Sequence, residues 1–324
     1  MEIRRLGTSG LALSSVTLGT LTWGRDTDEH EADALLATYL EAGGRSIDVP
    51  SDYFSPSFSG RCALVGQTLS RQVERDEITL VVHSGSPTVP HASVSGRPTP
   101  PGAATSRRNL LRSLDHALSE LVTPFVDVWV IRGPRRLVRY EEILAAAKLA
   151  VQSGRATYVA FADFSLWDLG ALTLGAQDDR IPLAALAGNL SLLSGSILET
   201  QIPHAIEQGI GYIALAPLAH GVLTGKYRSA TPPDSRAATT HLGEMVQPHL
   251  TPEADRVVEA VSRAAAQLDA TPARVALAWS LAQPGVATAV TGPRTARQLE
   301  TLLEGPTLKL QKELRSVLTE IALP

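Results

Sequence analysis

Short runs rich in β-branched residues alternate with longer helical patterns along the chain, and this alternation limits the fold more than any other feature. Eight strand-like runs occur, most of them rich in β-branched residues, at 15–20, 45–49, 78–83, 125–131, 157–162, 183–190, 212–216 and 286–291. Between them, apolar residues recur with the 3.6-residue period of an amphipathic helix, as at 29–42, 107–121 and 141–152. Strands that alternate with helices predict a parallel sheet covered by helices.

Eight strands with intervening helices predict an α/β fold of the closed (β/α)8 type, a TIM barrel. The runner-up is an open doubly wound sheet, but the first run is not followed by the glycine-rich turn that such a sheet uses to bind a dinucleotide. Because the composition does not change along the chain, we expect one barrel domain over residues 1–324. The long segments 84–105 and 228–250 each follow a strand, so we expect them over the barrel mouth.

The composition is that of an ordinary globular protein and argues against several functions. Hydrophobic residues make up 44% of the chain, and the net charge of −4 provides no basic surface for nucleic acid or anionic lipid. The single cysteine, Cys62, excludes an internal disulfide and argues against a zinc–thiolate cluster. The sequence shows neither a signal peptide nor the roughly 20 apolar residues of a membrane span. We therefore expect a cytoplasmic enzyme with a small-molecule substrate, and the oligomeric state stays open.

Chemically capable residues stand where several of the strand-like runs end. Asp48 lies in the second run with Tyr53 shortly after it, His83 closes the third, and Arg132 follows the fourth. The carboxyl ends of parallel strands face one crevice, so we expect these four residues to form the catalytic site. The first lysine of the chain is Lys148, so no ammonium group comes from these strand ends. The pattern indicates proton transfer by Tyr53 and His83.

Arg132 has two interpretations at this point. Its fork of donors suits a substrate carboxylate, phosphate or enolate, but a salt bridge to Asp163 or Asp48 is equally compatible with the sequence. The spacing of Asp48, His83 and Asp163 matches no standard ligand motif, so no metal site is predicted. Trp23, after the first run, is expected to line a substrate pocket, because interior positions of a barrel favour branched aliphatic residues.

Four features together resemble the aldo-keto reductase family, and the resemblance covers nearly the whole chain. They are RRLGTSGLALSSVTLGTLTWG (4–24), Asp48 five residues before Tyr53, APLAHGVLTGKY (216–227) and LAWSLAQPGVATAVTGPRTARQLE (277–300). The resemblance implies a (β/α)8 barrel that binds NADP(H) in an extended pose at the carboxyl ends of the strands. It also implies reduction of aldehydes and ketones by hydride transfer, with Tyr53 donating the proton.

The resemblance also shows where the catalytic tetrad of the family is changed. Family members combine the tyrosine with an aspartate, a lysine and a histidine, and Asp48 and Tyr53 match the first two positions. The lysine position falls on His83 and the histidine position on Arg132, so half of the tetrad is replaced. A histidine can take over the charge of the lysine only when it is protonated.

The positions that bind nicotinamide in the family are changed as well. Ala162 and Asp163 stand where the resemblance implies a Ser-Asn pair, and Leu190 stands where it implies a stacking tyrosine. We expect Asp163 and Leu190 to line the substrate pocket. Positions that would hold the phosphates of NADP(H) match the family at Lys226, Gly292, Arg294 and Gln298.

Two further polar features of the sequence each allow a functional and a purely structural interpretation. His220, in the loop after the seventh run, either reaches the ligand or is simply solvated. Arg294 and Arg297 either hold a phosphate or form an ordinary polar helix start.

Three functions remain compatible with the sequence. We place narrowly first a repurposed enzyme without a cofactor, in which Tyr53 and His83 carry out acid–base chemistry on a small carbonyl or anionic substrate by cyclisation, dehydration or isomerisation. The alternative is an atypical NADP(H)-dependent aldo-keto reductase. The third is a non-catalytic regulatory or binding barrel, which the resemblance to potassium-channel β subunits implies the fold can support.

Overall fold

The computed structural model describes residues 1–51, 60–85, 105–133 and 138–322. Its parallel strands form a closed barrel in the order β10-β3-β4-β5-β6-β7-β8-β9, so the predicted TIM barrel is confirmed. Each predicted strand differs from the observed one by at most one residue at either end. The strands are β3 (Val16–Gly19), β4 (Ser46–Pro50), β5 (Thr79–Ser84), β6 (Val126–Arg132), β7 (Ala156–Ala162), β8 (Leu183–Asn189), β9 (Gly211–Leu215) and β10 (Val286–Thr291).

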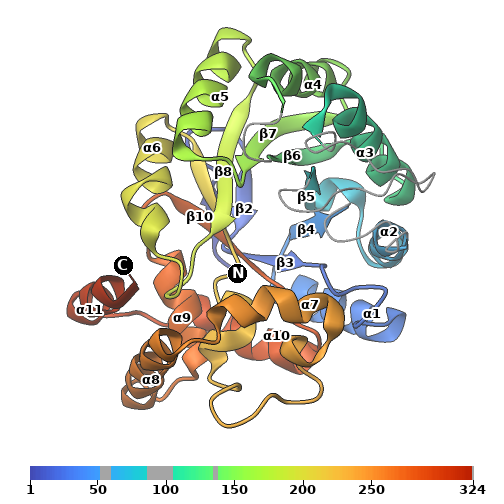
Figure 1. Cartoon of the computed structure of the whole chain (residues 1–324). Coiled ribbons are helices and arrows are strands. Elements are labelled where there is room, and N and C mark those ends of the chain that lie inside the picture. The colour runs from blue at the N-terminus through green and yellow to red at the C-terminus, as the bar shows by residue number, and fades with distance from the viewer. Residues whose placement is uncertain (52–59, 86–104, 134–137, 323–324) are drawn as a thin grey trace.

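Helices surround the barrel as a ring in Figure 1. A break near Thr271 separates two of these helices, and the Thr271 side chain caps the second by accepting a hydrogen bond of 3.3 Å from the Arg274 backbone N–H. The helices are α1 (Glu29–Glu41), α2 (Arg61–Gln72), α3 (Arg107–Glu120), α4 (Tyr140–Gln152), α5 (Leu166–Asp178), α6 (Gln201–Glu207), α8 (Pro252–Gln267), α9 (Pro272–Leu281), α10 (Ala296–Leu303) and α11 (Lys312–Ala322). No helix in these described ranges is long and apolar enough to cross a bilayer.

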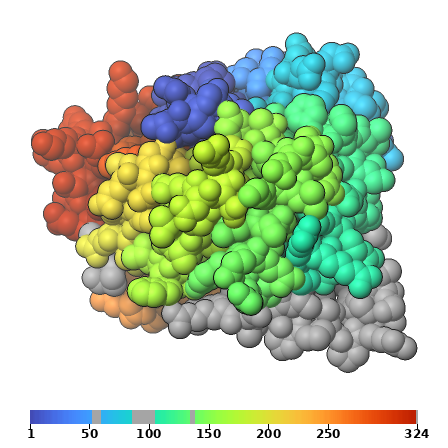
Figure 2. Space-filling model, turned by 90° about the horizontal axis from the view of Figure 1, so that it is seen from above, coloured from blue at the N-terminus to red at the C-terminus, as the bar shows by residue number. Residues whose placement is uncertain are grey.

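An N-terminal hairpin, which the sequence did not predict, closes the amino end of the barrel. It pairs β1 (Ile3–Arg5) with β2 (Ala12–Ser14) in antiparallel fashion. Leu6 and Leu13 are fully buried against the interior of the barrel, and the Thr8 backbone N–H donates to Gly209 O at 2.8 Å. In Figure 2 these dark-blue residues gather at one edge of the molecule. The opposite, carboxyl end of the barrel is therefore the end that is left for a ligand.

Alternation along the strands places the predicted catalytic residues inside the barrel mouth. Successive side chains of a strand point to opposite faces. Val128 and Val130 of β6 belong to the interior cluster, so Arg132 continues their face at the carboxyl end of the strand. In β5, Val81 belongs to the same interior cluster, and His83, two residues later, points to the same face. The carboxyl ends of the strands therefore hold these polar groups above the apolar interior of the barrel.

The segment 228–250, which we expected to be a loop, contains short helices. They are η6 (Arg236–Ala238), α7 (Thr240–Val246) and η7 (Gln247–His249), and they follow η5 (Ala219–Thr224) after β9. His241 Nε2 lies 2.9 Å from Asp26 Oδ2, which ties the segment to the loop after β3. In Figure 1, α7 accordingly lies near the loop that joins β3 to α1. Of the other expected loop, 84–105, residues 86–104 lie outside the described residues. The short 3₁₀ helices η2 (Arg75–Glu77), η4 (Ser196–Glu199) and η8 (Gly305–Thr307) complete the described elements.

Candidate functional site

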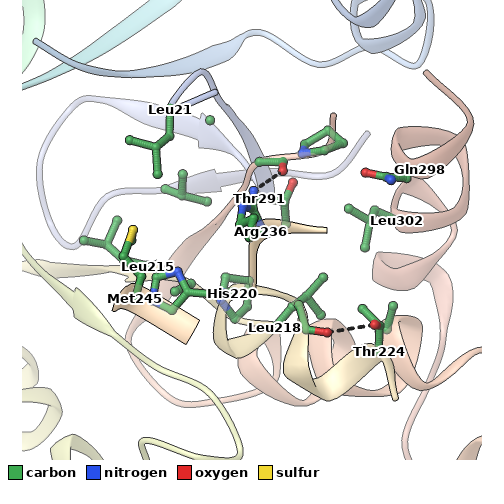
Figure 3. Close-up of a pocket in the computed structure, with 18 of the residues that line it drawn as sticks. Leu21, Leu215, Leu218, His220, Thr224, Arg236, Met245, Thr291, Gln298 and Leu302 are labelled. Atoms are coloured by element: carbon green, nitrogen blue, oxygen red, sulfur yellow. Dashed lines mark hydrogen bonds between the residues drawn. The ribbon is translucent and has the colours of Figure 1, made fainter. Parts of the chain in front are cut away.

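A cavity of about 430 Å³ lies at the carboxyl ends of the strands (Figure 3). This volume is within the usual range for small-ligand pockets. Its apolar wall includes Leu21, Pro50, Leu215, Leu218, Met245 and Leu302. Its polar side chains are Asp48, His83, Arg132, Asn189, His220, Thr224, Lys226, Arg236, Thr271, Thr291, Gln298 and Thr301. The cavity therefore reaches from the predicted catalytic residues to the predicted phosphate-binding residues.

At one end of the cavity, four polar side chains at the ends of neighbouring strands are linked by two polar contacts and an ion pair. His83 Nε2 contacts Asp48 Oδ2, and His83 Nδ1 lies 3.4 Å from Arg132 Nη1. Arg132 Nη2 in turn forms a salt bridge with Asp163 Oδ2. The order Asp48–His83–Arg132–Asp163 follows β4, β5, β6 and the residue after β7. We call this chain the mouth network.

Arg132 determines the tautomer of His83 in the mouth network. A guanidinium can only donate hydrogen bonds, so His83 Nδ1 has to accept from it and carries no proton. The proton of the neutral ring then lies on Nε2, which donates to Asp48. Both ring nitrogens are thus engaged by described side chains. In this arrangement His83 orients and connects its neighbours.

The electrostatics of the mouth network resolve the two interpretations of Arg132. The guanidinium pairs directly with the Asp163 carboxylate, and the exposed fractions of the side chains are 5% for Arg132 and 22% for Asp163. Because its charge is already paired, Arg132 attracts a substrate anion only weakly. The salt-bridge interpretation is the one that the structure supports.

Local backbone features make this pairing feasible. Asp163 has φ 62°, a left-handed conformation that aspartate tolerates better than most residues. Gly85, with φ 87°, directly follows β5, and a Cβ atom there would overlap the carbonyl oxygen of Arg132. Ala162 is in register with both Arg132 and Ala187, so small side chains flank the guanidinium.

Towards the other end of the cavity, two cationic side chains line the wall and form no salt bridge with the described residues. Lys226 is exposed at the rim, and Arg236 lies half-buried in the wall. Arg236 Nη2 donates to the backbone oxygen of Gly292 at 2.5 Å, and its buried Nε has no hydrogen-bond partner. Burial lowers the pKa of Arg236, and the neighbouring Arg294 adds to the effect. A ligand anion would relieve both conditions.

Two glycines keep room for these cations. A Cβ atom on Gly292 would lie 3.1 Å from Arg236 Nη2, and one on Gly221 would lie 3.3 Å from Lys226 Nζ. Gly221 also has φ 100°, a conformation that other residues rarely adopt. The chain thus leaves the charged ends of Lys226 and Arg236 accessible to the cavity.

Arg294 was expected at this end and is turned away from the cavity wall. Its Nη1 donates to the backbone oxygen of Asp234 at 2.5 Å, and its Nη2 lies 4.0 Å from Asp26 Oδ1. Gln298 lines the cavity, as Gly292 and Lys226 do, and its Oε1 accepts from the Arg294 backbone N–H at 2.9 Å. Arg294 therefore supports the wall, and Arg236 supplies the cationic group at this end.

Two residues expected in the substrate pocket lie elsewhere. Trp23 has an exposed fraction of 1% and packs in the core between strands and helices, outside the described cavity wall. Leu190 is fully buried, and its backbone oxygen accepts from Ser280 at 3.2 Å. Neither side chain lines the described cavity, because each packs in the core cluster behind the strand ends. Asp163 joins the mouth network without lining the cavity, and Tyr53 lies outside the described residues.

Sequence reasoning missed Arg236 and undervalued His220. Arg236 belongs to a segment without periodicity, so no pattern marked it. His220 was seen, but only its tertiary position shows that the ring lines the cavity. In the part of the chain that the structure describes, no three His, Cys, Asp or Glu side chains lie close enough to hold a metal ion.

Burial lowers the pKa of His220 to about 3, with further contributions from Arg236 and His249. In the unfolded chain the pKa returns to about 6.5. Between these values the unfolded state binds a proton that the folded state does not, so stability is full above pH 6.5 and falls as the pH decreases towards 3.

We expect His220 to lower the free energy of unfolding by about 2 kcal/mol at pH 5 relative to pH 7.5, since one pKa unit corresponds to about 1.4 kcal/mol. Urea denaturation of the wild type and of His220→Gln at both pH values measures this. The variant has no titrating group at this position, so its loss should be smaller by about that amount. Equal losses in the two proteins would contradict the assignment.

Comparison with known proteins agrees with the geometry of the barrel and its mouth. The Aldo/keto reductase family model matches residues 15–322. Similar proteins include an uncharacterized oxidoreductase, YrpG, of Bacillus subtilis, which is 27% identical over 99% of this chain and 96% of its own length. The L-glyceraldehyde 3-phosphate reductase of Escherichia coli K12 is 29% identical over 93% of this chain and 86% of its own. A putative voltage-gated potassium channel subunit beta of Schizosaccharomyces pombe is 28% identical over 92% and 86%. The chain belongs to the aldo/keto reductase family.

Proposed function

We propose that this protein is an NADP(H)-dependent reductase of small, uncharged carbonyl compounds. The observation that carries the proposal is the single cavity that connects the mouth network with Lys226 and Arg236. An aldo/keto reductase needs such a continuous path, because the reacting end and the phosphates of its cofactor are far apart. From the sequence alone this function ranks narrowly second; we now rank it first, because the shape and charge of the cavity support it.

The residues at the cationic end fit the phosphate groups of the cofactor. Arg236 Nε and Thr291 Oγ1 are buried polar atoms in the cavity region without a hydrogen-bond partner, which is costly unless a ligand satisfies them. Lys226 adds a second positive charge, and Gln298 a neutral amide. These four side chains would hold NADP(H), which supplies a hydride when bound. Arginine and lysine are the side chains that proteins most often use for phosphate.

At the other end, the chain has to supply a proton to the developing alkoxide. Tyr53 is the proposed donor, on the strength of the family resemblance. Asp48 and His83 are proposed as positioning residues, because the hydrogen bonds of the His83 ring are already taken by Asp48 and Arg132. An imidazole that is already engaged by Asp48 and Arg132 gives Tyr53 less electrostatic help than the ammonium group of a lysine would. We therefore expect slow turnover relative to reductases with the complete tetrad.

The charge of the mouth network bears on the substrate. Asp48 and Asp163 outnumber the single cation Arg132, so a substrate anion would be repelled at this end. Leu21, Leu215 and other apolar side chains form much of the nearby wall. A neutral aldehyde or ketone with an apolar substituent fits this combination.

Titration with NADPH, followed by its oxidation with a panel of neutral and carboxylated aldehydes and ketones, tests the proposed function. We expect micromolar affinity, measurable turnover of neutral carbonyls, and weaker turnover of their carboxylated analogues. Tyr53→Phe should remove turnover and keep the affinity for NADPH. Absence of NADPH binding would rule the function out.

A second candidate is cofactor-independent acid–base chemistry at the same mouth. It is favoured by the replacement of two tetrad positions, His83 and Arg132, and by the burial of Leu190 where the family has a stacking ring. In that case NADPH would not bind, and turnover of an enolisable substrate would still depend on Tyr53. A non-catalytic role, in line with the names of the potassium channel subunits, would instead leave no turnover with any substrate.

A further inference from the structure

His220 has an unusual backbone conformation at the wall of the cavity. It follows β9 in η5, and its φ of 55° falls between the left-handed Ala219 (47°) and Gly221 (100°). Non-glycine residues in this region are uncommon, and they cluster at functional sites. The conformation turns the imidazole towards the cavity, where Figure 3 shows it beside Leu215 and Met245.

The ring of His220 has no hydrogen-bond partner among the described residues, although it is largely buried. Its nearest aromatic neighbour is His249, with ring centroids 5.7 Å apart and planes tilted by 34°. The ring lines the cavity, and neither of its nitrogens is among the fully buried polar atoms without a partner, so both can be reached from the cavity. The ring is therefore free to donate one hydrogen bond and accept another within the cavity.

The charged and titratable groups around His220 keep it neutral. Arg236 from η6 and His249 from η7 both lower its pKa, after the larger effect of burial. Lys226 is the other cation close by, since its Nζ lies 3.3 Å from a Cβ built on Gly221. The two cations can bind an anion, and the neutral ring in the same cavity wall offers one hydrogen-bond donor and one acceptor without charge.

We propose that His220 is a specificity-determining residue that binds, as a neutral imidazole, a hydroxyl or amide group of the ligand next to the anionic group held by Lys226 and Arg236. The ligand chemistry is that of a phosphorylated sugar or a nucleotide, in which a ribose hydroxyl stands close to a phosphate. This inference rests on the proposed function for the identity of the ligand as a dinucleotide, but it holds for any ligand with that pair of groups.

The variants His220→Gln and His220→Met test the proposal, because the glutamine and methionine side chains are similar in length and flexibility. Only glutamine can donate and accept a hydrogen bond. By NADPH titration we expect His220→Met to bind roughly 10-fold more weakly, the size of one lost hydrogen bond, and His220→Gln to stay within about 3-fold of wild type. His249→Gln, which changes the neighbouring ring outside the cavity wall, should bind as wild type does.

The pH dependence of NADPH affinity shows whether the His220 ring binds the ligand in its neutral or its protonated form. The ratio of wild-type to His220→Met affinity should stay constant from pH 5 to 9. A ratio that grows below pH 7 would mean that a protonated His220 binds the phosphate itself, and equal affinities of the Met and Gln variants would mean that the ring acts by packing. Either result overturns the proposal.

A second ligand distinguishes failure of this inference from failure of the proposed function. If the wild type binds ribose 5-phosphate but not NADPH, the reductase function falls, and the same pattern of variants with ribose 5-phosphate would support the role of His220. If the wild type binds neither, both are overturned. Thermal melting of each variant shows that it is folded.

Discussion

Replacing Arg132 by leucine is expected to lower the free energy of unfolding by about 3 kcal/mol. Removal of one partner from a buried ion pair leaves the other charge without compensation, which typically costs about 3–5 kcal/mol. The lower value applies because the Asp163 side chain keeps an exposed fraction of 22% and so retains some hydration. His83 Nδ1 also loses its donor. Urea unfolding followed by circular dichroism measures the effect.

Two further variants test whether the loss of stability in Arg132→Leu comes from the buried ion pair. Asp163→Asn should cost about 2 kcal/mol, because it leaves the buried Arg132 charge without its ion pair, although asparagine still offers an oxygen acceptor and tolerates the left-handed backbone. Arg139→Leu removes an exposed pair with Glu141 and should change stability by less than about 0.5 kcal/mol. The double variant of Arg132 and Asp163 should be less destabilised than the two single changes added together. If Arg132→Leu were as stable as Arg139→Leu, the ion pair in the mouth network would not contribute to the stability of the fold.

Removing the two cavity cations is expected to weaken NADPH binding by about three orders of magnitude. A hydrogen bond to a charged group contributes about 1.5–3 kcal/mol, so Lys226→Met and Arg236→Met should each cost about 10- to 100-fold in affinity. Arg236→Lys keeps the charge and should lose less than Arg236→Met. Fluorescence titration gives the dissociation constants, and the wild type should also show the stronger dependence on salt.

Arg297→Met is the matched control for this experiment. Arg297 is exposed on α10 and lies outside the described cavity wall, so its loss removes one positive charge near the site without removing a contact. We expect its NADPH affinity to stay within about 2-fold of wild type. An equal loss in Arg297→Met and Arg236→Met would mean that only the overall charge matters. The phosphate assignment would then be wrong.

The barrel could be predicted because its determinants are local. A buried parallel strand needs a short β-branched run, and its helix needs an apolar stripe, so each element is visible in its own stretch of sequence. The N-terminal hairpin was missed because its strands are only three residues long. The short helices in 228–250 were missed for the same reason, since one or two turns carry too few residues to show a period.

The strand-end rule brought Asp48, His83 and Arg132 together correctly, because parallel strands in register end at one level. It could not predict that Arg132 would form an ion pair with Asp163. That outcome depends on a left-handed aspartate and on small side chains from neighbouring strands, which meet only in the closed barrel.

The amino-acid order therefore specifies the (β/α)8 barrel, the family and the side chains that stand at the strand ends. The arrangement in space specifies how those side chains use their hydrogen bonds and which cations face a ligand. Arg294 and Arg236 make the difference plain: the first is bound by the Asp234 backbone, and the second keeps a buried donor towards the cavity. Hydrogen bonds and ion pairs between residues far apart in sequence are decided by distances that only the folded chain sets, so no local pattern could have separated these two arginines.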